Sequence, residues 1–383
     1  MSSDDTRGMP ASHLVRAVAA AFAIPGRWVS SAPWGSGHIN QTLLSIFEQN
    51  GRTQRYIQQR INPAVFPEPL KVMENLARVT AHQRTVLQGE GVKDLDRRAL
   101  RLLPTRSGAL SFVDDEGAHW RTYPFVEGAS SHDMVRTPRD AAVAAEAFGR
   151  FQGQLTSLPG PRLHETIPRF HDGRARLEAL LAAVRSDPCQ RLSGCRVELD
   201  FVLAREAMVD RLPTLVARGA IPERITHNDT KLNNVLLDDR SGEALCVIDL
   251  DTVMPGLVHY DFGDLARTAT CAAAEDERDL SRVGADPMFF AALCEGYLRG
   301  AASFLTRAEC AELAFSARLL TLLIGLRFLT DHLAGDRYFR VHRENHNLDR
   351  CRTQLRLVAS MEEQGARLEE IVARAAERTP PHS

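Results

Sequence analysis

The sequence predicts an α+β protein with two parts, a small β-rich N-terminal lobe and a larger, mostly helical C-terminal lobe. Strand-like apolar runs and hairpin turns dominate residues 1–126, and the spacing of apolar residues becomes helical over residues 127–383. Two short apolar runs, 235–237 and 244–250, interrupt the helical part and flank the polar turn 238–243, which is the pattern of a β-hairpin. A chain of 383 residues is long enough for two such domains.

The N-terminal part opens with a helix that Ser12 can cap and that ends near Phe22. Strand-like runs then follow at residues 28–32, 42–48 and 55–61. Residues 69–88 repeat apolar side chains at helical spacing before Gly89. We therefore expect three strands followed by one amphipathic helix.

A glycine-containing turn of Gly35, Ser36, Gly37 and His38 separates the first two strand runs. Glycines allow the backbone to lie close over phosphate groups, where Cβ atoms would clash, so this turn suits a nucleotide-binding flap. Its strand-to-strand setting argues against a dinucleotide-binding turn, which joins a strand to a helix. A plain hairpin turn is the alternative.

The C-terminal part is expected to be built from helices. Residues 140–155 are rich in Ala, and residues 198–212 form the helix expected before a polar cluster. Further helices are expected near residues 259–272, 286–304, 307–334 and 347–377. Most of their large apolar side chains are expected in the core.

The composition argues against several classes of protein. The 47 Lys and Arg residues and 49 Asp and Glu residues give a formal charge of −2, so no overall field favours nucleic acid or an anionic membrane. Seven scattered cysteines without a Cys-x-x-Cys motif indicate reduced thiols and argue against zinc. The most hydrophobic stretch, 315–333, carries Arg318, Arg327 and Asp331 and is too charged to cross a bilayer. We expect a cytoplasmic monomer or homodimer without a nucleic-acid or membrane partner.

The residues with chemical potential lie at the two ends of the predicted hairpin. Its first strand follows His227-x-Asp229-x-x-x-x-Asn234, and its second ends at Asp249-Leu-Asp251. Phosphoryl transfer needs a carboxylate that orients and deprotonates the acceptor hydroxyl, together with hard oxygen ligands for Mg²⁺. The pattern favours this chemistry, although the same residues fit a polar turn in which Asp229 caps a helix and Asn234 begins a strand.

The segments 227–236 and 247–256 resemble the catalytic loop and the metal-binding segment of the aminoglycoside phosphotransferase-like kinases. Within that family they are most similar to the N-acetylhexosamine 1-kinases. The likeness extends to residues 35–40 and 325–354, and so covers most of the chain. The resemblance implies a bilobal protein-kinase-like fold, with ATP and Mg²⁺ as cofactors.

The resemblance also implies a role for individual residues. It makes Asp229 the catalytic residue and gives Asn234 and Asp249 to the metal. It places the turn from Gly35 to His38 over the phosphates.

On the nucleotide side, Arg60 stands where the fold of this family normally has a Lys on its third strand. A guanidinium is permanently charged and can pair with phosphates, so we expect Arg60 to contact them, with Glu74 of the following helix as its partner. The alternatives are a solvated strand charge at Arg60 and an ordinary exposed acid at Glu74. Tyr123 and Phe125 lie in the segment expected to meet adenine through its backbone.

Asp261-Phe-Gly263 repeats the metal-binding triplet of protein kinases, but we expect a structural role for it. It begins 32 residues after Asp229, and the segment before it contains Pro255 and Gly256 instead of a continuous strand. Asp249 has the strand-end position that a metal ligand needs. By resemblance, Asp261 would begin a helix and hydrogen-bond the catalytic loop.

The acceptor is expected to bind in the C-terminal part. Arg327 and Tyr338 match, by context, residues that contact the amino sugar in the N-acetylhexosamine 1-kinases, and His171 and Asp172 lie in a loop where they could reach a ligand. The alternatives are a surface Arg with a half-buried Tyr, and a turn in which Asp172 caps the next helix. Between residues 327 and 356, seven Arg outnumber four acids, which disfavours a polycationic acceptor.

Together these observations predict an ATP- and Mg²⁺-dependent small-molecule kinase that phosphorylates a sugar, at the anomeric hydroxyl of an N-acetylhexosamine or hexose. Two alternatives stay open. One is a kinase for another small alcohol, such as an amino alcohol or an aminoglycoside-type antibiotic. The other is an inactive nucleotide-binding module, against which the intact set of Asp229, Asn234 and Asp249 argues.

Overall fold

The computed structural model describes residues 10–35, 39–132 and 134–382, and the chain forms two compact units. The first unit contains residues 1–130, 157–167 and 236–253, and the second contains residues 131–156, 168–235 and 254–383. Both units are therefore discontinuous in sequence. The boundary expected between residues 126 and 127 lies near the first crossing, at residue 130, and as a domain boundary it stays a prediction.

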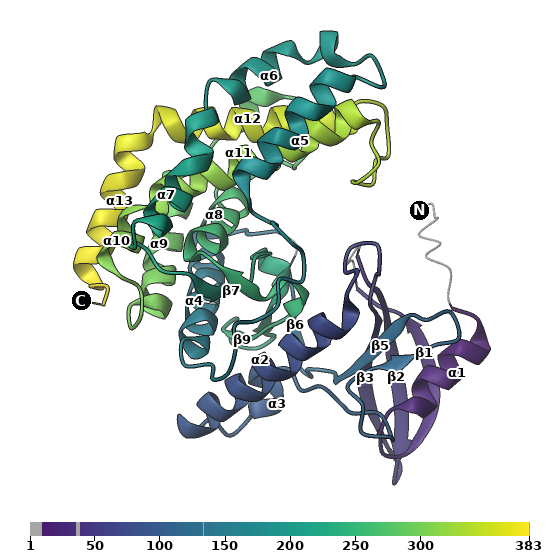
Figure 1. Cartoon of the computed structure of the whole chain (residues 1–383). Coiled ribbons are helices and arrows are strands. Elements are labelled where there is room, and N and C mark those ends of the chain that lie inside the picture. Colours follow the sequence, from purple (N-terminus) through teal and green to yellow (C-terminus); the bar gives the residue numbers. More distant parts are fainter. Residues whose placement is uncertain (1–9, 36–38, 133, 383) are drawn as a thin grey trace. The chain divides into compact units, whose positions relative to one another are not determined.

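A five-stranded antiparallel sheet is the centre of the first unit (Figure 1), with the order β1-β2-β3-β5-β4. Its strands are β1 (Arg27–Pro33), β2 (Gln41–Gln49), β3 (Arg52–Arg60), β4 (Phe112–Val113) and β5 (His119–Pro124). Alternate residues of β2 are buried, as the two-residue period of a strand requires. Leu43 and Phe47 of β2 pack with Val18 of α1 (Ser12–Ala21) in one core. The three strand runs expected from the sequence are confirmed as β1, β2 and β3.

The helix expected over residues 69–88 is confirmed as α2 (Pro69–Gly89). Pro69 suits its first turn, where a missing N–H costs nothing, and Val72, Leu76 and Val79 are buried. The short helix α3 (Leu95–Arg98) follows. A second sheet of this unit consists of β6 (Ala129–Ser130), β8 (Val235–Asp238) and β9 (Ala244–Val247), in that order. The adjacent strands β8 and β9 are the hairpin that the sequence predicts.

The second unit consists mainly of helices. They are α4 (Pro138–Leu155), α5 (Gly173–Ser186), α6 (Arg196–Leu203), α7 (Arg211–Ala217), α8 (Val258–Ala269), α9 (Pro287–Ala301), α10 (Arg307–Ala311), α11 (Leu313–Ala334), α12 (His346–Glu363) and α13 (Gly365–Arg378). The short strands β7 (Arg224–Thr226) and β10 (Met254–Gly256) pair antiparallel. The helices expected near residues 140–155, 259–272 and 286–304 are confirmed. The stretches 307–334 and 347–377 are each divided into two. The single helix expected over residues 198–212 is wrong, because α6 ends at Leu203 and a 3-10 turn (Glu206–Asp210) precedes α7.

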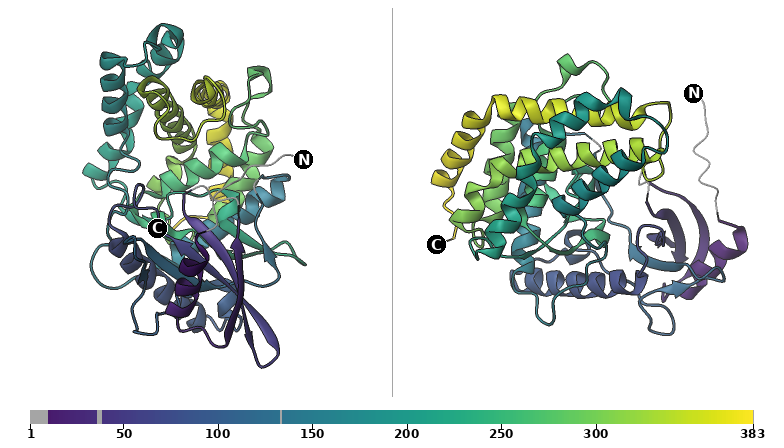
Figure 2. Two further views of the ribbon diagram at one scale, coloured as in Figure 1. Left: turned by 90° about the vertical axis from the view of Figure 1, so that its right-hand side faces the viewer. Right: turned by 45° about the horizontal axis from the view of Figure 1, so that its top comes forward.

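The helix α11 runs through the helical bundle of the second unit (Figure 2) and packs against α5, α8 and α12. Contrary to the expectation from its three charged residues, it is long and apolar enough to cross a membrane by length and composition alone, with a mean hydropathy of 1.6 over its most apolar window. In the protein, however, 78% of that window is buried. The hydrophobicity of α11 is that of a core helix, whose apolar residues face neighbours on several sides.

The helices α4 and α9 cross so closely that their contact needs glycine. A Cβ atom on Gly149 of α4 would lie 2.7 Å from the carbonyl oxygen of Tyr297. Cβ atoms on Gly296 and Gly300 of α9 would collide with the backbone of Ala142 and Glu146, respectively. Three glycines therefore set the distance between these two helices.

We predict that Gly296→Ala lowers the free energy of unfolding by about 1–3 kcal/mol, because the added methyl group forces the helix backbones apart. The matched control is Gly89→Ala at the end of α2, where a Cβ atom would meet nothing within 4 Å. Denaturant unfolding of both variants measures the effect. Equal stability of the two variants would show that the α4–α9 contact tolerates a side chain.

Candidate active site

The strand β7 leads the chain into the candidate site and is held by β10, with Thr226 paired to Met254. A Cβ atom on Gly256 of β10 would collide with the side chain of Thr226, so this pairing requires glycine. Asn228 then turns the chain with a φ of 66°, a left-handed conformation that Asn tolerates better than most residues. The chain emerges from this turn at Asp229.

A buried carboxylate supports this turn from α8. Asp261 accepts hydrogen bonds from the backbone N–H groups of His227 (2.8 Å) and Asn228 (2.6 Å), and from the side-chain amide of Gln152 (2.6 Å). Burial raises the pKa of Asp261 to about 6, although its three donors oppose the shift. The structural role expected for Asp261 is confirmed, because its oxygens are directed at the loop backbone.

The carboxylate of Asp229 is held by two neighbours in the loop. Lys231 Nζ lies 2.8 Å from Oδ1, and Asn234 Nδ2 donates to Oδ2 (3.1 Å) and to the Asp229 carbonyl (2.8 Å). The single turn η3 (Leu232–Asn234) brings the Asn234 amide back to the loop. Burial alone would raise the pKa of Asp229, but Lys231, His227 and Asn234 together lower it below its usual value.

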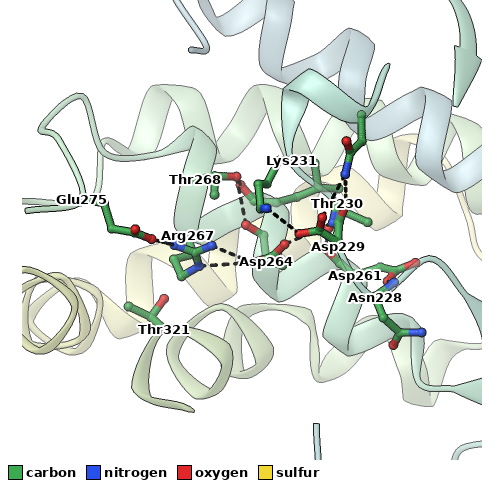
Figure 3. A network of polar contacts seen from close by, with 12 residues as sticks. Asn228, Asp229, Thr230, Lys231, Asp261, Asp264, Arg267, Thr268, Glu275 and Thr321 are labelled. Carbon is green, nitrogen blue, oxygen red and sulfur yellow. Dashed lines mark hydrogen bonds and ion pairs between the residues drawn. The ribbon is translucent and has the colours of Figure 1, made fainter. Parts of the chain in front are cut away.

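A second carboxylate of α8 extends the support (Figure 3). Asp264 accepts from the backbone N–H of Thr230 (3.1 Å) and from the guanidinium of Arg267 (2.9 Å). Arg267 also pairs with Glu275 (3.1 Å). Because Asp261 and Asp264 are three residues apart on one helix, they share a face and hold the loop on both sides of Asp229.

Asp249 and Asp251, two residues apart after β9, differ in environment. Asp249 is exposed and adopts the left-handed conformation (φ 58°, ψ 57°) before the turn η4 (Leu250–Thr252). Asp251 has 2% of its surface exposed and pairs with Arg121 of β5. The exposed carboxylate is the one that solvent and ligands can reach.

The residues expected to contact phosphates are only partly described. Gly35 follows β1 with a φ of 80°, and Ser36, Gly37 and His38 lie outside the described residues. Their predicted role therefore stays a prediction.

The expected pairing of Arg60 with Glu74 is wrong. Arg60 forms an ion pair with Glu116 and lies 3.6 Å from Asp114, while Glu74 Oε2 lies 2.9 Å from His164 Nε2. Arg60 ends β3 opposite Trp120, so its side chain reaches the turn between β4 and β5, whereas Glu74 lies one turn inside α2. The role of Arg60 as a phosphate contact stays a prediction.

The two aromatic residues of the predicted adenine segment differ in exposure. Tyr123 is buried on β5 (5% exposed), and burial, with Asp251 and Asp249 nearby, raises its pKa above the usual value. Phe125 is half-buried against the edge of Trp34 (5.6 Å between ring centroids), with the guanidinium of Arg55 4.0 Å from its centre. The segment thus presents one aromatic wall, formed by Phe125 and Trp34.

Of the two residues before α5 expected to reach a ligand, His171 and Asp172, Asp172 has a structural role. Asp172 caps α5 through the N–H of Ala175 (2.9 Å) and pairs with Arg169 (2.6 Å), which is the alternative left open by the sequence. His171 lies between the rings of Phe170 (4.5 Å) and Tyr260 (4.9 Å).

The imidazole of His171 also reaches the loop that precedes Asp229. Its Nε2 lies 3.2 Å from the carbonyl oxygen of Asn228. Burial lowers the pKa of His171 to about 4, so the ring is neutral near pH 7 and Nε2 donates to that oxygen. His171 therefore adjoins the loop that carries Asp229.

Arg327 and Tyr338, eleven residues apart, lie together, with Nη2 of the guanidinium 3.4 Å from the phenol oxygen, and their predicted contact with an acceptor stays a prediction. The guanidinium carbon also lies 5.5 Å from the centre of the Phe170 ring, a residue adjacent to His171. Asp331 holds the loop of Tyr338 by accepting from three successive backbone N–H groups. The second unit thus brings Arg327, Tyr338 and His171 into one neighbourhood.

Sequence reasoning missed two contributors to this site, Lys231 and Asp264. A signal existed for both. Lys231 lies within the motif, two residues after Asp229, and Asp264 follows Asp261 at the spacing that places two residues on one helix face.

Comparison with known proteins identifies the family. The model of the phosphotransferase enzyme family APH matches residues 32–313, and the chain belongs to this family. It is therefore a small-molecule phosphotransferase whose acceptor is an alcohol group.

Three solved structures share the fold at low identity. A microcompartment-associated aminopropanol kinase is 15% identical, covering 93% of this chain and 98% of that one, with a TM-score of 0.56. An aminoglycoside phosphotransferase from Alicyclobacillus acidocaldarius is also 15% identical (coverage 95% and 96%, TM-score 0.54). A spectinomycin phosphotransferase is 10% identical (coverage 97% and 100%, TM-score 0.52). The fold class expected from the sequence is confirmed.

We predict that Asp261→Asn lowers the free energy of unfolding by about 1–3 kcal/mol. The substitution replaces one accepting oxygen of Asp261 with an N–H₂ donor, so a backbone N–H that has an acceptor in the unaltered protein would lose it. Asp249→Ala, on an exposed side chain, should leave the melting temperature nearly unchanged and abolish phosphotransfer. Thermal melts and activity assays of both variants measure these effects. The reverse pattern would exchange the roles assigned to the two carboxylates.

Proposed function

We propose that the protein transfers the γ-phosphoryl group of ATP to the anomeric C1 hydroxyl of an N-acetylhexosamine or hexose. The observation that carries the proposal is the arrangement of Asp229, whose two carboxylate oxygens are held by Lys231 and Asn234 at 2.8 and 3.1 Å. A carboxylate fixed in this way can orient a hydroxyl group for attack on phosphorus. Phosphoryl transfer depends mainly on such positioning and on charge stabilisation.

In the proposed reaction, the sugar hydroxyl hydrogen-bonds to Asp229 and gives it a proton while the hydroxyl oxygen attacks the γ-phosphorus. The bond from that phosphorus to the β,γ-bridging oxygen breaks, and ADP leaves with the electron pair. The low pKa of Asp229 keeps the carboxylate ionised at neutral pH and makes it a weak base. Orientation of the hydroxyl is then its larger contribution.

The donor set fits a magnesium ion. The Asn234 amide nitrogen is engaged with Asp229, so the amide oxygen is the atom that a cation would take, and Asp249 offers an exposed carboxylate. Asn234 directly precedes β8 and Asp249 follows the adjacent strand β9, which supports a shared role. Both are the hard oxygen ligands that Mg²⁺ prefers, and bound Mg²⁺ would neutralise the phosphate oxygens.

The proposed acceptor site consists of Arg327, Tyr338 and His171. A guanidinium, a phenol and a neutral imidazole are hydrogen-bonding groups that suit sugar hydroxyls and an amide carbonyl. Arg176 lies close to this group, since its Nη2 donates to the carbonyl oxygen of Phe170 (2.9 Å), and burial and the charge of Arg327 lower its pKa. Within the described part of the chain, no carboxylate forms an ion pair with Arg176 or Arg327.

An amino alcohol is the second candidate acceptor, and the shared fold of the aminopropanol kinase favours it. An amino alcohol carries an ammonium group near the reacting hydroxyl. The guanidinium groups of Arg176 and Arg327 would repel that charge. We therefore favour a sugar over an amino alcohol as the acceptor. The protein is further proposed to be cytoplasmic and either monomeric or dimeric.

Asp229→Asn keeps the shape of the side chain but removes the proton acceptor. We predict that turnover falls by at least ~10²-fold while ATP binding persists. Steady-state kinetics with a panel of sugars and amino alcohols, together with equilibrium titration of ATP, measure both effects. Near-normal turnover would remove Asp229 from the mechanism.

Arg327→Ala should lower kcat/KM for the sugar by roughly 5- to 150-fold, because losing one buried hydrogen-bond partner costs about 1–3 kcal/mol, while the KM for ATP stays nearly constant. The control is Arg337→Ala, an exposed arginine of the adjacent loop. Equal losses in the two variants would contradict the assignment of Arg327.

The same assay tests which hydroxyl reacts. A methyl glycoside of the preferred sugar has its C1 oxygen blocked and should not be phosphorylated. Mass spectrometry and NMR of the products measure this for the free sugar and the glycoside. Comparable turnover of the glycoside would place the reaction at another hydroxyl.

A further inference from the structure

The buried carboxylate of Asp251 joins three separate segments of the first unit. Its Oδ2 accepts from the side-chain amide of Asn40 (2.6 Å), and its Oδ1 pairs with the guanidinium of Arg121. Its backbone carbonyl accepts from the hydroxyl of Thr166 (2.7 Å). Asp251 and Arg121 are 2% and 1% exposed, so the pair is shielded from solvent. Hydrogen bonds to Asn40 and Thr166 hold Asp251 in addition to its attraction to Arg121.

The partners of Asp251 are themselves anchored. The amide oxygen of Asn40 accepts from the backbone N–H of Asn62 (3.0 Å). The guanidinium of Arg121 donates from Nε and Nη2 to the amide oxygen of Gln59 (3.1 and 2.9 Å). Burial alone would lower the pKa of Arg121, but attraction to Asp251 and Asp249 keeps it above the usual value. The side chains of Asn40 and Arg121 are therefore held in orientations that direct their N–H groups at Asp251, and the Asp251 carboxylate cannot rotate without losing these hydrogen bonds.

This arrangement decides whether Asp251 is a metal ligand or a structural carboxylate. The spacing Asp249-Leu-Asp251 would allow both acids to bind a metal ion. Both oxygens of Asp251 are already occupied, by Asn40 and Arg121, whereas Asp249 is exposed. A metal ion at Asp251 would have to displace a buried cation, which is costly.

Asn40 and Asp251 connect this network to neighbouring parts of the chain. Asn40 is the residue directly before β2. Asp251 lies two residues after Asp249, whose left-handed backbone (φ 58°) persists only where the surroundings enforce it. Because only Leu250 separates the two acids, fixing Asp251 also restrains the backbone that carries Asp249.

We propose that Asn40, Arg121 and Asp251 form a buried clamp that positions Asp249 for binding the metal ion of an ATP–Mg²⁺ complex. The proposal rests on the proposed function, because it assumes an ATP–Mg²⁺ complex as the donor. The three clamp residues are positioning residues and touch neither phosphate nor metal. Their loss should change the binding of the complex more than that of ATP alone.

Asn40→Ala tests the clamp without leaving a buried charge unpaired. Equilibrium titration with ATP, in the presence and absence of Mg²⁺ and without acceptor, measures both affinities. We expect the variant to bind ATP–Mg²⁺ roughly tenfold more weakly, as for one lost hydrogen bond to a charged group. Binding of ATP without Mg²⁺ should change less than about twofold, within the scatter of a remote surface change. Equal losses with and without Mg²⁺, or no loss, would overturn the clamp.

A double-variant cycle with Asp249→Ala tests whether Asn40 acts through Asp249. In the Asp249→Ala background the proposed pathway is already interrupted, so adding Asn40→Ala should have no further effect on the affinity for ATP–Mg²⁺. A second, full loss in that background would show that Asn40 acts on the nucleotide by itself. That result would overturn the clamp.

The charged part of the clamp is tested by replacing Arg121 and Asp251 together with Leu, since removing a buried ion pair as a unit is often tolerated by the fold. The Mg²⁺-dependent part of the affinity should fall as in Asn40→Ala. The matched control is Gln58→Ala, which removes a buried amide of β3 that contacts Ser45 and Thr122 instead. It should lower the melting temperature and leave ATP–Mg²⁺ binding unchanged.

Three outcomes are distinguishable. If the unaltered protein binds no ATP, the proposed function fails, and the clamp fails with it. If it binds ATP–Mg²⁺ and the clamp variants bind equally well, only the clamp fails. If Gln58→Ala weakens ATP–Mg²⁺ binding as much as Asn40→Ala does, the effect is general destabilisation of the sheet, and the clamp is again overturned.

Discussion

A carboxylate with no exposed surface, that of Asp261, accepts hydrogen bonds from the backbone N–H groups of His227 and Asn228. These donors lie where the chain takes its left-handed turn, so the carboxylate stabilises a backbone that would otherwise relax. Asp264, one helical turn later, holds Thr230 in the same way. The position of Asp229 between these anchors depends on α8, and an acid that touches no substrate thereby determines the geometry of the candidate site.

Burial distinguishes structural aspartates from aspartates that can bind a ligand. Asp251 and Asp261 are buried and satisfied by donors from the protein, as a buried charge must be. Asp229 keeps 22% of its side chain exposed and Asp249 is exposed, so these two can meet a ligand. This division explains why the acid of the Asp-Phe-Gly triplet is structural although its sequence is that of a metal site.

The acceptor side follows from charge and from aromatic packing. The guanidinium of Arg327 lies among the rings of Phe170, Tyr338 and Phe339, at 5.4–5.6 Å from their centres. Such contacts stabilise a cation without neutralising it, and Arg176 adds a second positive charge nearby. The neighbourhood therefore remains positive, which is why the proposed acceptor is a neutral, oxygen-rich molecule and not an amine.

The sequence by itself determined the strands β1 to β3, the helix α2 and the β8–β9 hairpin. Each of these depends on residues that are close along the chain, where periodicity and spacing carry the information. Tertiary structure alone decided that Arg60 pairs with Glu116 instead of Glu74, and that Asp251 meets Arg121, 130 residues away. Such partners depend on strand register and on where each helix begins, and these are set by the packing of the whole unit.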